Sequence, residues 1–227
     1  ARIRNRSRGR YGAPMVIRMP YGGGINALEH HSESMEALFA HTPGLKVVIP
    51  STPGDAKGLL ISAIESEDPI IFMEPKRLYR AIKQEVSEDK YSIPIGQAKV
   101  LSHGSDLTVV AYGALIREGQ RAMVKAKDMG ISVELIDLRT IYPIDKTTVI
   151  ESIKKTGRLV VVTEGPGSFG VGAELITIAN EEAFLHLEAP PKRVSGFDTI
   201  VPLPKGEHHY IISPDKILFE IEKTVKY

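Results

Sequence analysis

The chain has 227 residues, of which 42% are hydrophobic and 25% charged, a composition that excludes global disorder and predicts one or two globular domains. It contains no cysteine, which excludes a disulfide scaffold, a thiol nucleophile and a thiolate-bound metal centre. The formal net charge of +1 creates no field that would recruit nucleic acid. No apolar run is long enough to span a membrane, so we expect a cytoplasmic enzyme or enzyme subunit.

Arginines stand at alternate positions at the start of the printed sequence: Arg2, Arg4, Arg6, Arg8 and Arg10. One interpretation is a basic arm that binds nucleic acid. The other is the solvated end of a helix that leads into a strand. No aromatic residues interleave with the arginines and the rest of the chain is neutral, which favours the second interpretation.

Residues 1–80 alternate between short apolar runs and helical patterns, which is typical of a parallel sheet. The predicted strands are Pro14–Met19, Leu45–Pro50 and Pro69–Glu74. The predicted helices are His31–His41, with Ser32 as its cap, and Ala56–Ser66. We expect this first domain to end near residue 80, because residues 81–105 are polar and read as a linker.

Residues 106–227 restart the alternation with longer elements, and the sequence predicts a second α/β domain there. Its strands are near-continuous apolar runs, as expected when helices cover both faces of a sheet: Asp106–Tyr112, Ser132–Leu138, Arg158–Thr163 and Pro191–Ser195. Its predicted helices are Leu115–Met129, Asp145–Lys155, Gly172–Glu182 and Ser213–Tyr227, the last with Pro214 in its first turn.

The glycine run Pro20–Gly24 is followed by two adjacent histidines, and this pattern is the first candidate site. Glycines at a strand end let the backbone approach a ligand closely. His30 and His31 would precede a helix N-terminus, where the helix dipole favours a neutral imidazole that can donate a hydrogen bond or move a proton. The alternative is that both are surface caps. A zinc site is disfavoured, because consecutive histidines cannot both face one metal from a regular helix.

The segment Glu164–Gly172 is a second candidate, because its glycines lie between a strand and a helix. Its spacing fits neither a dinucleotide-binding loop nor a P-loop. We therefore predict a tight turn at the carboxyl edge of the sheet, which is also the edge where α/β domains bind ligands or partners.

The remaining polar motifs carry weaker signals. The scattered histidines are read as structural or solvated: His41, His103, His186, His208 and His209. Glu33 and Glu36 could pair as carboxylates but are more typical of capping groups. No serine stands in a G-x-S-x-G motif, which disfavours a serine hydrolase.

Seven co-linear strings together resemble the beta subunit of the thiamine-diphosphate-dependent 2-oxo acid dehydrogenases. They are Ile17–Gly24, His30–Leu60, Asp68–Arg80, Ile93–Val100, Val133–Asp145, Lys155–Gly165 and Leu187–Thr199. The resemblance covers essentially the whole chain. The string EPKRLYR (Glu74–Arg80) favours the branched-chain members over the pyruvate members.

This resemblance implies an α/β fold with an incomplete pyrimidine-binding parallel-sheet domain (1–80), a linker (81–105) and a transketolase C-terminal-like domain (106–227). It implies an α2β2 heterotetramer in which thiamine diphosphate and Mg²⁺ are held mainly by the alpha subunit. The implied activity is oxidative decarboxylation of branched-chain 2-oxo acids or pyruvate, with acyl transfer to lipoyl groups of a dihydrolipoyl acyltransferase core.

The family's active-site histidine lies in an H-S-x-S string, which here is His31–Ser34, so the resemblance assigns the catalytic role to His31. The family also binds a potassium ion through backbone carbonyls, and hard cations prefer such oxygen ligands. The matching positions are Ala13, Met15, Val16, Ala63, Ser66 and Asp68. The alternative occupant of that position is an ordered water.

Family members carry roughly ninety further residues before the position of Ala1, a length difference that shortens the first domain. The cofactor-activating glutamate lies in that segment, so no cofactor-binding residue is assigned and we expect this chain alone to be inactive. Two alternatives stay open. One is a transketolase-like or deoxyxylulose-phosphate-type synthase, and the other is a non-catalytic module that holds the tetramer and docks the acyltransferase.

Overall fold

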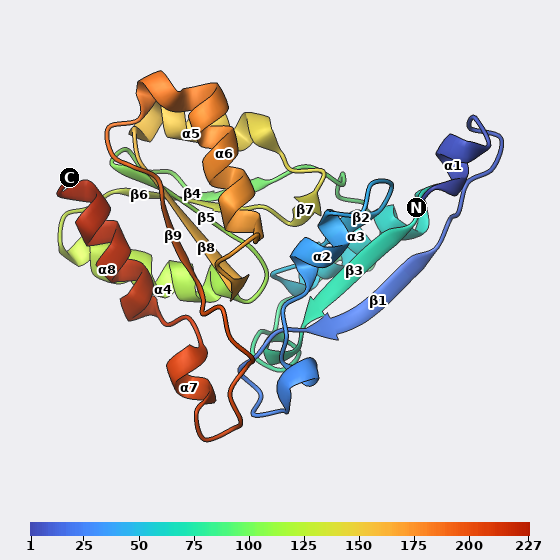
Figure 1. Cartoon of the computed structure of the whole chain (residues 1–227), viewed down its shortest axis with the longest axis horizontal. Coiled ribbons are helices and arrows are strands. Elements are labelled where there is room, and N and C mark those ends of the chain that lie inside the picture. Colours follow the sequence, from blue (N-terminus) through green and yellow to red (C-terminus); the bar gives the residue numbers. More distant parts are fainter.

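The computed structural model describes the backbone of residues 1–227 and every side chain except that of Glu29. It contains two sheets (Figure 1). The first has the strand order β1-β3-β2-β7. Its strands are β1 (Val16–Tyr21), β2 (Lys46–Val48), β3 (Ile70–Pro75) and β7 (Thr140–Tyr142). Strands β1, β2 and β3 run parallel, as predicted, while β7 is antiparallel to β2.

The second sheet has five strands in the order β4-β6-β5-β8-β9. They are β4 (Lys99–Ser102), β5 (Leu107–Ala111), β6 (Val133–Asp137), β8 (Leu159–Pro166) and β9 (Lys192–Gly196). The last four are mutually parallel, and β4 adds an antiparallel edge to β6. Every residue of β5 and β6 is buried, which explains why their sequences lack apolar–polar alternation.

Helices cover both faces of the second sheet (Figure 1). Helices α4 (Leu115–Asp128) and α8 (Pro214–Val225) pack together on one face, and α5 (Lys146–Thr156) and α6 (Val171–Ala183) pack on the other. The shorter helices are α1 (Ile3–Arg6), α2 (Glu36–Ala40), α3 (Pro53–Ile64), α7 (Glu207–Tyr210), η1 (Glu29–His31), η2 (Lys76–Leu78) and η3 (Phe184–His186). None of these described helices has the length and apolar character needed to cross a membrane.

Local capping chemistry sets the ends of the longer helices. The Asp145 side chain accepts a hydrogen bond from the Thr148 N–H at the start of α5, and Gly157 ends that helix with φ of 68°. The Ser213 side chain caps α8, whose first residue is Pro214. Asp145, Ser213 and Pro214 are the residues at which the sequence predicted the starts of these two helices.

The largest apolar cluster extends from the first sheet into the second. It joins Tyr21, Ile71 and Met73 of the first sheet to Val110 and Ile136 of the second. A second cluster lies under α4 and α8, and a third lies between α3 and the first sheet. Because the two sheets share a core, the side chains at their junction are shielded from water.

Strand β7 was not predicted from the sequence. It follows β6 in the second half of the chain but pairs with β2 in the first sheet, with Val47 opposite Tyr142 and Val48 opposite Thr140. The Ile49 N–H also donates to the Arg139 carbonyl at 2.8 Å. The second half of the chain therefore completes the first sheet, and the domain bounds 1–80, 81–105 and 106–227 stay a prediction.

The predicted helix His31–His41 is wrong in its first half. His31 ends η1, and α2 begins only at Glu36. Ser32 does not cap α2, because its hydroxyl donates to the Ala27 carbonyl at 3.3 Å. The Glu33 carbonyl is also engaged, by the Gly22 N–H at 3.0 Å. These two contacts hold residues 32–35 out of a helix.

The arginines at the start of the chain lie in and around α1. Arg4 forms ion pairs with Asp68 at 2.5 Å and with Glu67 at 3.0 Å. These contacts favour the structural interpretation of at least this arginine over a nucleic-acid arm.

Candidate functional site

His31 lies in a closed loop, residues 22–33, that connects β1 to the segment before α2. The loop closes through the hydrogen bond from the Gly22 N–H to the Glu33 carbonyl. The imidazoles of His30 and His31 are exposed, with ring centroids 4.6 Å apart. The His31 carbonyl accepts a hydrogen bond from Lys76 Nζ. His31 is therefore accessible at the end of the loop, and it is not at the N-terminus of α2 as the sequence predicted.

Two buried carboxylates from the second half of the chain bind the backbone of this loop. Glu164 Oε1, at the end of β8, accepts the Gly23 N–H at 2.6 Å. Glu207, in α7, accepts the N–H groups of Gly24 and Asn26, one on each carboxylate oxygen, at 2.7 Å. The glycine run does permit the close approach that the sequence indicated, but here the approaching groups belong to the protein itself.

The geometry explains why glycines occupy these positions. Gly22 and Gly24 have φ values of +85° and +87°, which side chains other than glycine rarely adopt. A Cβ atom at Gly22 would lie 3.0 Å from Glu164 Oε1, and one at Gly23 would lie 3.2 Å from Glu207 Oε1. Larger residues would push the loop away from both carboxylates.

Glu164 has a cation beside it. The Arg77 guanidinium, in η2, lies 3.2 Å from Glu164 Oε2, and both side chains are largely buried. Burial raises the pKa of Glu164, against the opposing effects of Arg77 and of the Gly23 N–H. Glu207 is 1% exposed, and its two carboxylate oxygens accept the two backbone N–H groups of Gly24 and Asn26.

A third carboxylate, Glu36, lies near this loop at the junction of the two halves. Its Oε1 accepts a hydrogen bond from the Tyr112 hydroxyl at 2.7 Å, and burial raises its pKa. Glu36 Oε2, Ser34 Oγ and Arg77 Nε are buried without a hydrogen-bond partner. Because unpaired buried polar groups are costly, this unused capacity fits a polar ligand group. The carboxylate pair of Glu33 and Glu36 that was considered from the sequence stays a prediction.

A second group of buried carboxylates also joins the two halves of the chain. Arg139, between β6 and β7, is paired with Asp55 of α3 at 2.5 Å. The Ser51 hydroxyl donates to Asp137, and the Arg139 N–H donates to the same carboxylate at 3.0 Å. Burial raises the pKa of Asp137 to about 7.

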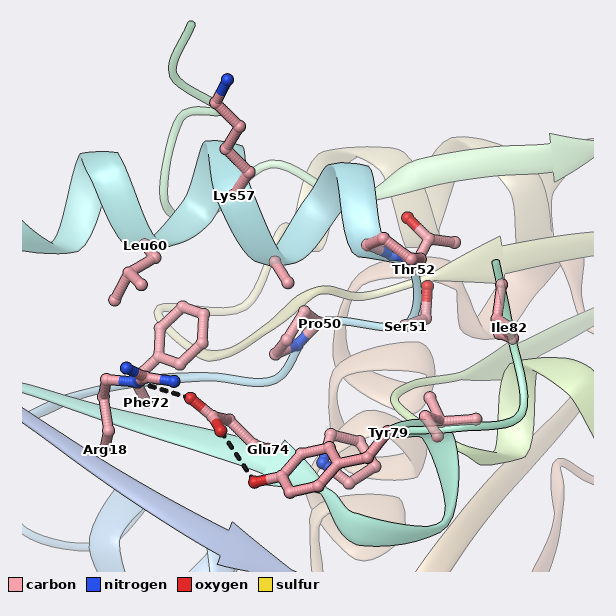
Figure 2. Close-up of a pocket in the computed structure, with 14 residues that line it drawn as sticks. Arg18, Pro50, Ser51, Thr52, Lys57, Leu60, Phe72, Glu74, Tyr79 and Ile82 are labelled. Atoms are coloured by element: carbon pink, nitrogen blue, oxygen red, sulfur yellow. Dashed lines mark hydrogen bonds and ion pairs between the residues drawn. The ribbon is translucent and has the colours of Figure 1, made fainter. Parts of the chain in front are cut away.

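A cavity of about 650 Å³ lies between α3 and β3. Among its lining residues, the Glu74 carboxylate accepts hydrogen bonds from Arg18 Nε at 2.6 Å and from the Tyr79 hydroxyl at 2.8 Å. Figure 2 shows both contacts. Burial, and to a lesser extent the hydrogen bond to Glu74, raises the pKa of Tyr79 to about 12. His31, Glu164 and Glu207 do not line this cavity, so it is separate from the loop site.

The other predicted positions fall in different places. Glu164–Gly172 forms the predicted strand-to-helix turn, since β8 ends at Pro166 and α6 begins at Val171. The scattered histidines do not gather. Across the described side chains, no three His, Asp or Glu residues lie close enough to hold a metal ion.

The carbonyl positions named for potassium meet at one corner of the first sheet. The Met15 carbonyl accepts the Ile70 N–H at 2.9 Å, the Ala63 carbonyl accepts the Ser66 N–H at 3.3 Å, and the Ala13 N–H donates to Glu67. The Asp68 carbonyl accepts the Ser66 hydroxyl, and Val16 pairs with Ile70. The corner brings these positions together, while the potassium site itself stays a prediction.

Comparison with known proteins decides the family. Residues 1–82 match the family described as "Transketolase, pyrimidine binding domain", and residues 96–217 match "Transketolase, C-terminal domain". The chain is 59% identical over its whole length to "Pyruvate dehydrogenase E1 component subunit beta" of Acholeplasma laidlawii, covering 69% of that protein. It is 52% identical to the protein of the same name from Mycoplasma genitalium, with the same coverage.

The chain belongs to the family of pyruvate dehydrogenase E1 beta subunits. This family depends on thiamine diphosphate, with Mg²⁺ held mainly by the alpha subunit. The resemblance to 2-oxo acid dehydrogenase beta subunits is therefore confirmed. The preference for the branched-chain members finds no support in these relatives, which are named for pyruvate.

The fold is also shared with a solved structure of much lower sequence identity. The solved structure "Split gene transketolase, inactive beta4 tetramer" superposes with a TM-score of 0.76 at 22% identity, over 93% of this chain and 66% of that one. This likeness concerns the fold alone, and it confirms the predicted transketolase-like architecture.

Sequence reasoning missed Glu207 and Arg77, and it treated Glu164 only as the start of a turn. A signal was present for Glu164: it is an acidic residue at the end of the apolar run Leu159–Val162, and acids are rarely fully buried unless paired. No comparable signal marks Glu207, which stands 183 positions from its partner Gly24.

Proposed function

We propose that this chain is the beta subunit of a pyruvate dehydrogenase first component, assembled with an alpha subunit as an α2β2 heterotetramer. The overall activity is oxidative decarboxylation of pyruvate with reductive acylation of lipoyl groups on a dihydrolipoyl acyltransferase core. The observation that carries the proposal is 59% identity along the whole chain to a protein of that name, together with an exposed His31 in a tethered loop.

We propose that His31 is the catalytic residue contributed by this chain. When bound, thiamine diphosphate supplies the electron sink for decarboxylation. The imidazole of His31 is free to reach a reacting group, because the loop is held through its backbone and not through the ring. Its role is to donate a hydrogen bond and move a proton during acyl transfer to the incoming lipoyl group.

The residues near His31 fit the polar end of a cofactor. Ser34 Oγ and Glu36 Oε2 are buried without partners, so they can accept or donate hydrogen bonds to a group that enters the junction. We propose that they contribute to the binding wall on this chain, with the diphosphate and Mg²⁺ held by the alpha subunit.

The test replaces His31 in the assembled heterotetramer. His31→Ala should leave thiamine diphosphate binding unchanged and lower acyl transfer to a lipoyl domain by about 100-fold or more, the scale of a lost acid–base catalyst. His186→Ala is the matched control, since His186 is exposed and lies on η3. Unchanged turnover of His31→Ala with the lipoyl-domain acceptor would refute the role. Assembly with the alpha subunit but no decarboxylation by the unaltered protein would instead favour the non-catalytic module.

The substrate is tested by competition between 2-oxo acids. We propose pyruvate, because the relatives are named for it, and expect kcat/KM for pyruvate to exceed that for branched-chain 2-oxo acids. The reverse order would support the preference that Glu74–Arg80 indicated.

We also propose that potassium binds the carbonyls of Ala13, Met15, Val16, Ala63, Ser66 and Asp68. These positions lie at the corner where β1 and β3 begin and α3 ends. The unfolding midpoint should be higher in potassium chloride than in choline chloride at equal ionic strength, because a bound cation stabilises the folded state. Equal midpoints would argue against the site.

A further inference from the structure

The loop that carries His31 has few internal restraints. Its own contacts are the closing bond between Gly22 and Glu33, the 3.3 Å bond from Ser32 to Ala27, and the turn from the His31 N–H to Leu28 at 3.0 Å. Three of its first residues are glycines, which lose more conformational freedom on ordering than any other residue. Such a segment needs an external tether to keep one conformation.

One tether comes from the first half, where Lys76 Nζ donates to the His31 carbonyl; the contacts to the glycine run come from the second half of the chain. Three N–H groups within four residues, those of Gly23, Gly24 and Asn26, all donate to Glu164 or Glu207. These two glutamates are 5% and 1% exposed, so their carboxylate groups are largely shielded from water. Hydrogen bonds to charged acceptors in such surroundings are the stronger kind.

We propose that Glu164 and Glu207 are positioning residues for His31: by binding the N–H groups of Gly23, Gly24 and Asn26 they fix the loop so that its imidazole stands at the reaction centre. This inference rests on the proposed role of His31. It gives α7 a function, because the second half of the chain sets the geometry of a residue supplied by the first half.

Glu207→Gln is the most direct probe in the assembled heterotetramer. The amide keeps the volume of the side chain but can offer only one oxygen to two N–H donors. The loss of a hydrogen bond to a charged group predicts amide exchange at Gly24 or Asn26 faster by about tenfold or more. Acyl transfer should slow by about 10- to 100-fold in kcat with little change in KM for pyruvate.

The matched control is Glu181→Gln, an exposed glutamate on α6, which should leave amide exchange in residues 22–33 and turnover unchanged. The double variant His31→Ala with Glu207→Gln separates positioning from a general structural effect. If Glu207 acts through His31, the double variant should transfer acyl groups no more slowly than His31→Ala alone.

Three results would overturn the proposal: slow amide exchange retained in Glu207→Gln, fast exchange with unchanged acyl transfer, or a double variant slower than His31→Ala. If Glu207→Gln does not fold, Gly23→Ala takes its place, because its Cβ would lie 3.2 Å from Glu207 Oε1 and displace the loop without removing a charge. Failure of the proposed role of His31 would show up in a different experiment, as unchanged acyl transfer by the His31→Ala variant.

Discussion

Two groups of buried carboxylates join the halves of this chain, and they do so in different ways. Glu164 and Glu207 bind backbone N–H groups of an irregular loop. Asp55 of α3 and Asp137 of β6 are bound chiefly by two side chains, that of Arg139 in the turn between β6 and β7 and that of Ser51 in the connection between β2 and α3.

The difference teaches what each junction can do. Regular elements are already ordered by their own hydrogen bonds, so the Asp55–Arg139 pair sets how the halves dock. The glycine run at the start of the loop has no such order of its own, so the carboxylates that bind it determine its conformation. We call the Asp55, Asp137, Ser51 and Arg139 group the docking junction, and the Glu164, Glu207 and Arg77 group the loop junction. Mutations in the docking junction should chiefly lower stability. Mutations in the loop junction should chiefly affect local order and catalysis.

The largest expected effect on stability comes from Arg139→Met. It leaves the Asp55 carboxylate buried without its cation, which costs about 3–5 kcal/mol of unfolding free energy. Urea denaturation at a fixed protein concentration measures it. The control is Arg121→Met, which removes an exposed pair with Glu118 and should cost less than about 1 kcal/mol. Equal losses of unfolding free energy in the two variants would mean that the buried Asp55–Arg139 pair matters no more to stability than an exposed ion pair.

Arg77→Met tests the loop junction in the same assay. Glu164 keeps the Gly23 N–H but loses its cation, and we expect a loss of about 1.5–3 kcal/mol. Amide exchange should also rise in residues 22–33, which Arg139→Met should leave protected. If both variants loosened the loop equally, the two junctions would not be independent.

The docking junction should also control how stability depends on pH. Burial raises the pKa of Asp137 from 3.8 to about 7, so between these values the folded chain holds a proton that the unfolded chain has released. The free energy of unfolding therefore falls as pH rises through this window, by up to about 1.4 kcal/mol per pH unit.

Asp137→Asn removes that titration and should flatten the slope between pH 4 and 7 in urea denaturation. Part of the slope should remain, because burial also raises the pKa values of Glu36 and Glu164. A variant with the same slope as the unaltered chain would show that Asp137 is ionised throughout.

The smallest effect on stability is expected for Gly24→Ala. The positive φ costs about 1–2 kcal/mol, and the new Cβ would lie 3.0 Å from Arg77 Cδ. Gly130→Ala is the control, since Gly130 has φ of +79° and no neighbour within 4 Å of the added atom. Gly24→Ala should lower the thermal midpoint more than Gly130→Ala and also speed amide exchange in the loop. Equal shifts of the thermal midpoint in the two variants would mean that only the positive φ, and not the contact with Arg77, destabilises Gly24→Ala.

The sequence predicts most of this fold because its strongest signals are local. The strands β5 and β8 contain near-continuous apolar runs, and Asp145 and Ser213 are helix-end residues next to the helices they limit. Strand β7 escaped prediction because three residues show no periodicity and its partner β2 lies nearly a hundred positions away. The start of α2 escaped because Glu33 and Ser32 bond to the preceding loop.

The residues of the candidate site also fall into those that the sequence could predict and those that only the structure reveals. The glycine run and His31 stand together in the sequence, so both could be found there. The carboxylates that hold them belong to β8 and α7, and only the folded chain brings these elements to the loop. Long-range pairing of a side chain with a backbone N–H leaves no pattern in one sequence.

Strand β7 makes the two halves depend on each other. Because Thr140–Tyr142 pairs with the edge of β2, the two halves cannot separate as rigid bodies without breaking the hydrogen bonds between β2 and β7. A fragment that stops before Lys99 would present β2 as a bare edge, prone to recruit a strand from another molecule. The two halves of the chain should consequently unfold in one thermal transition.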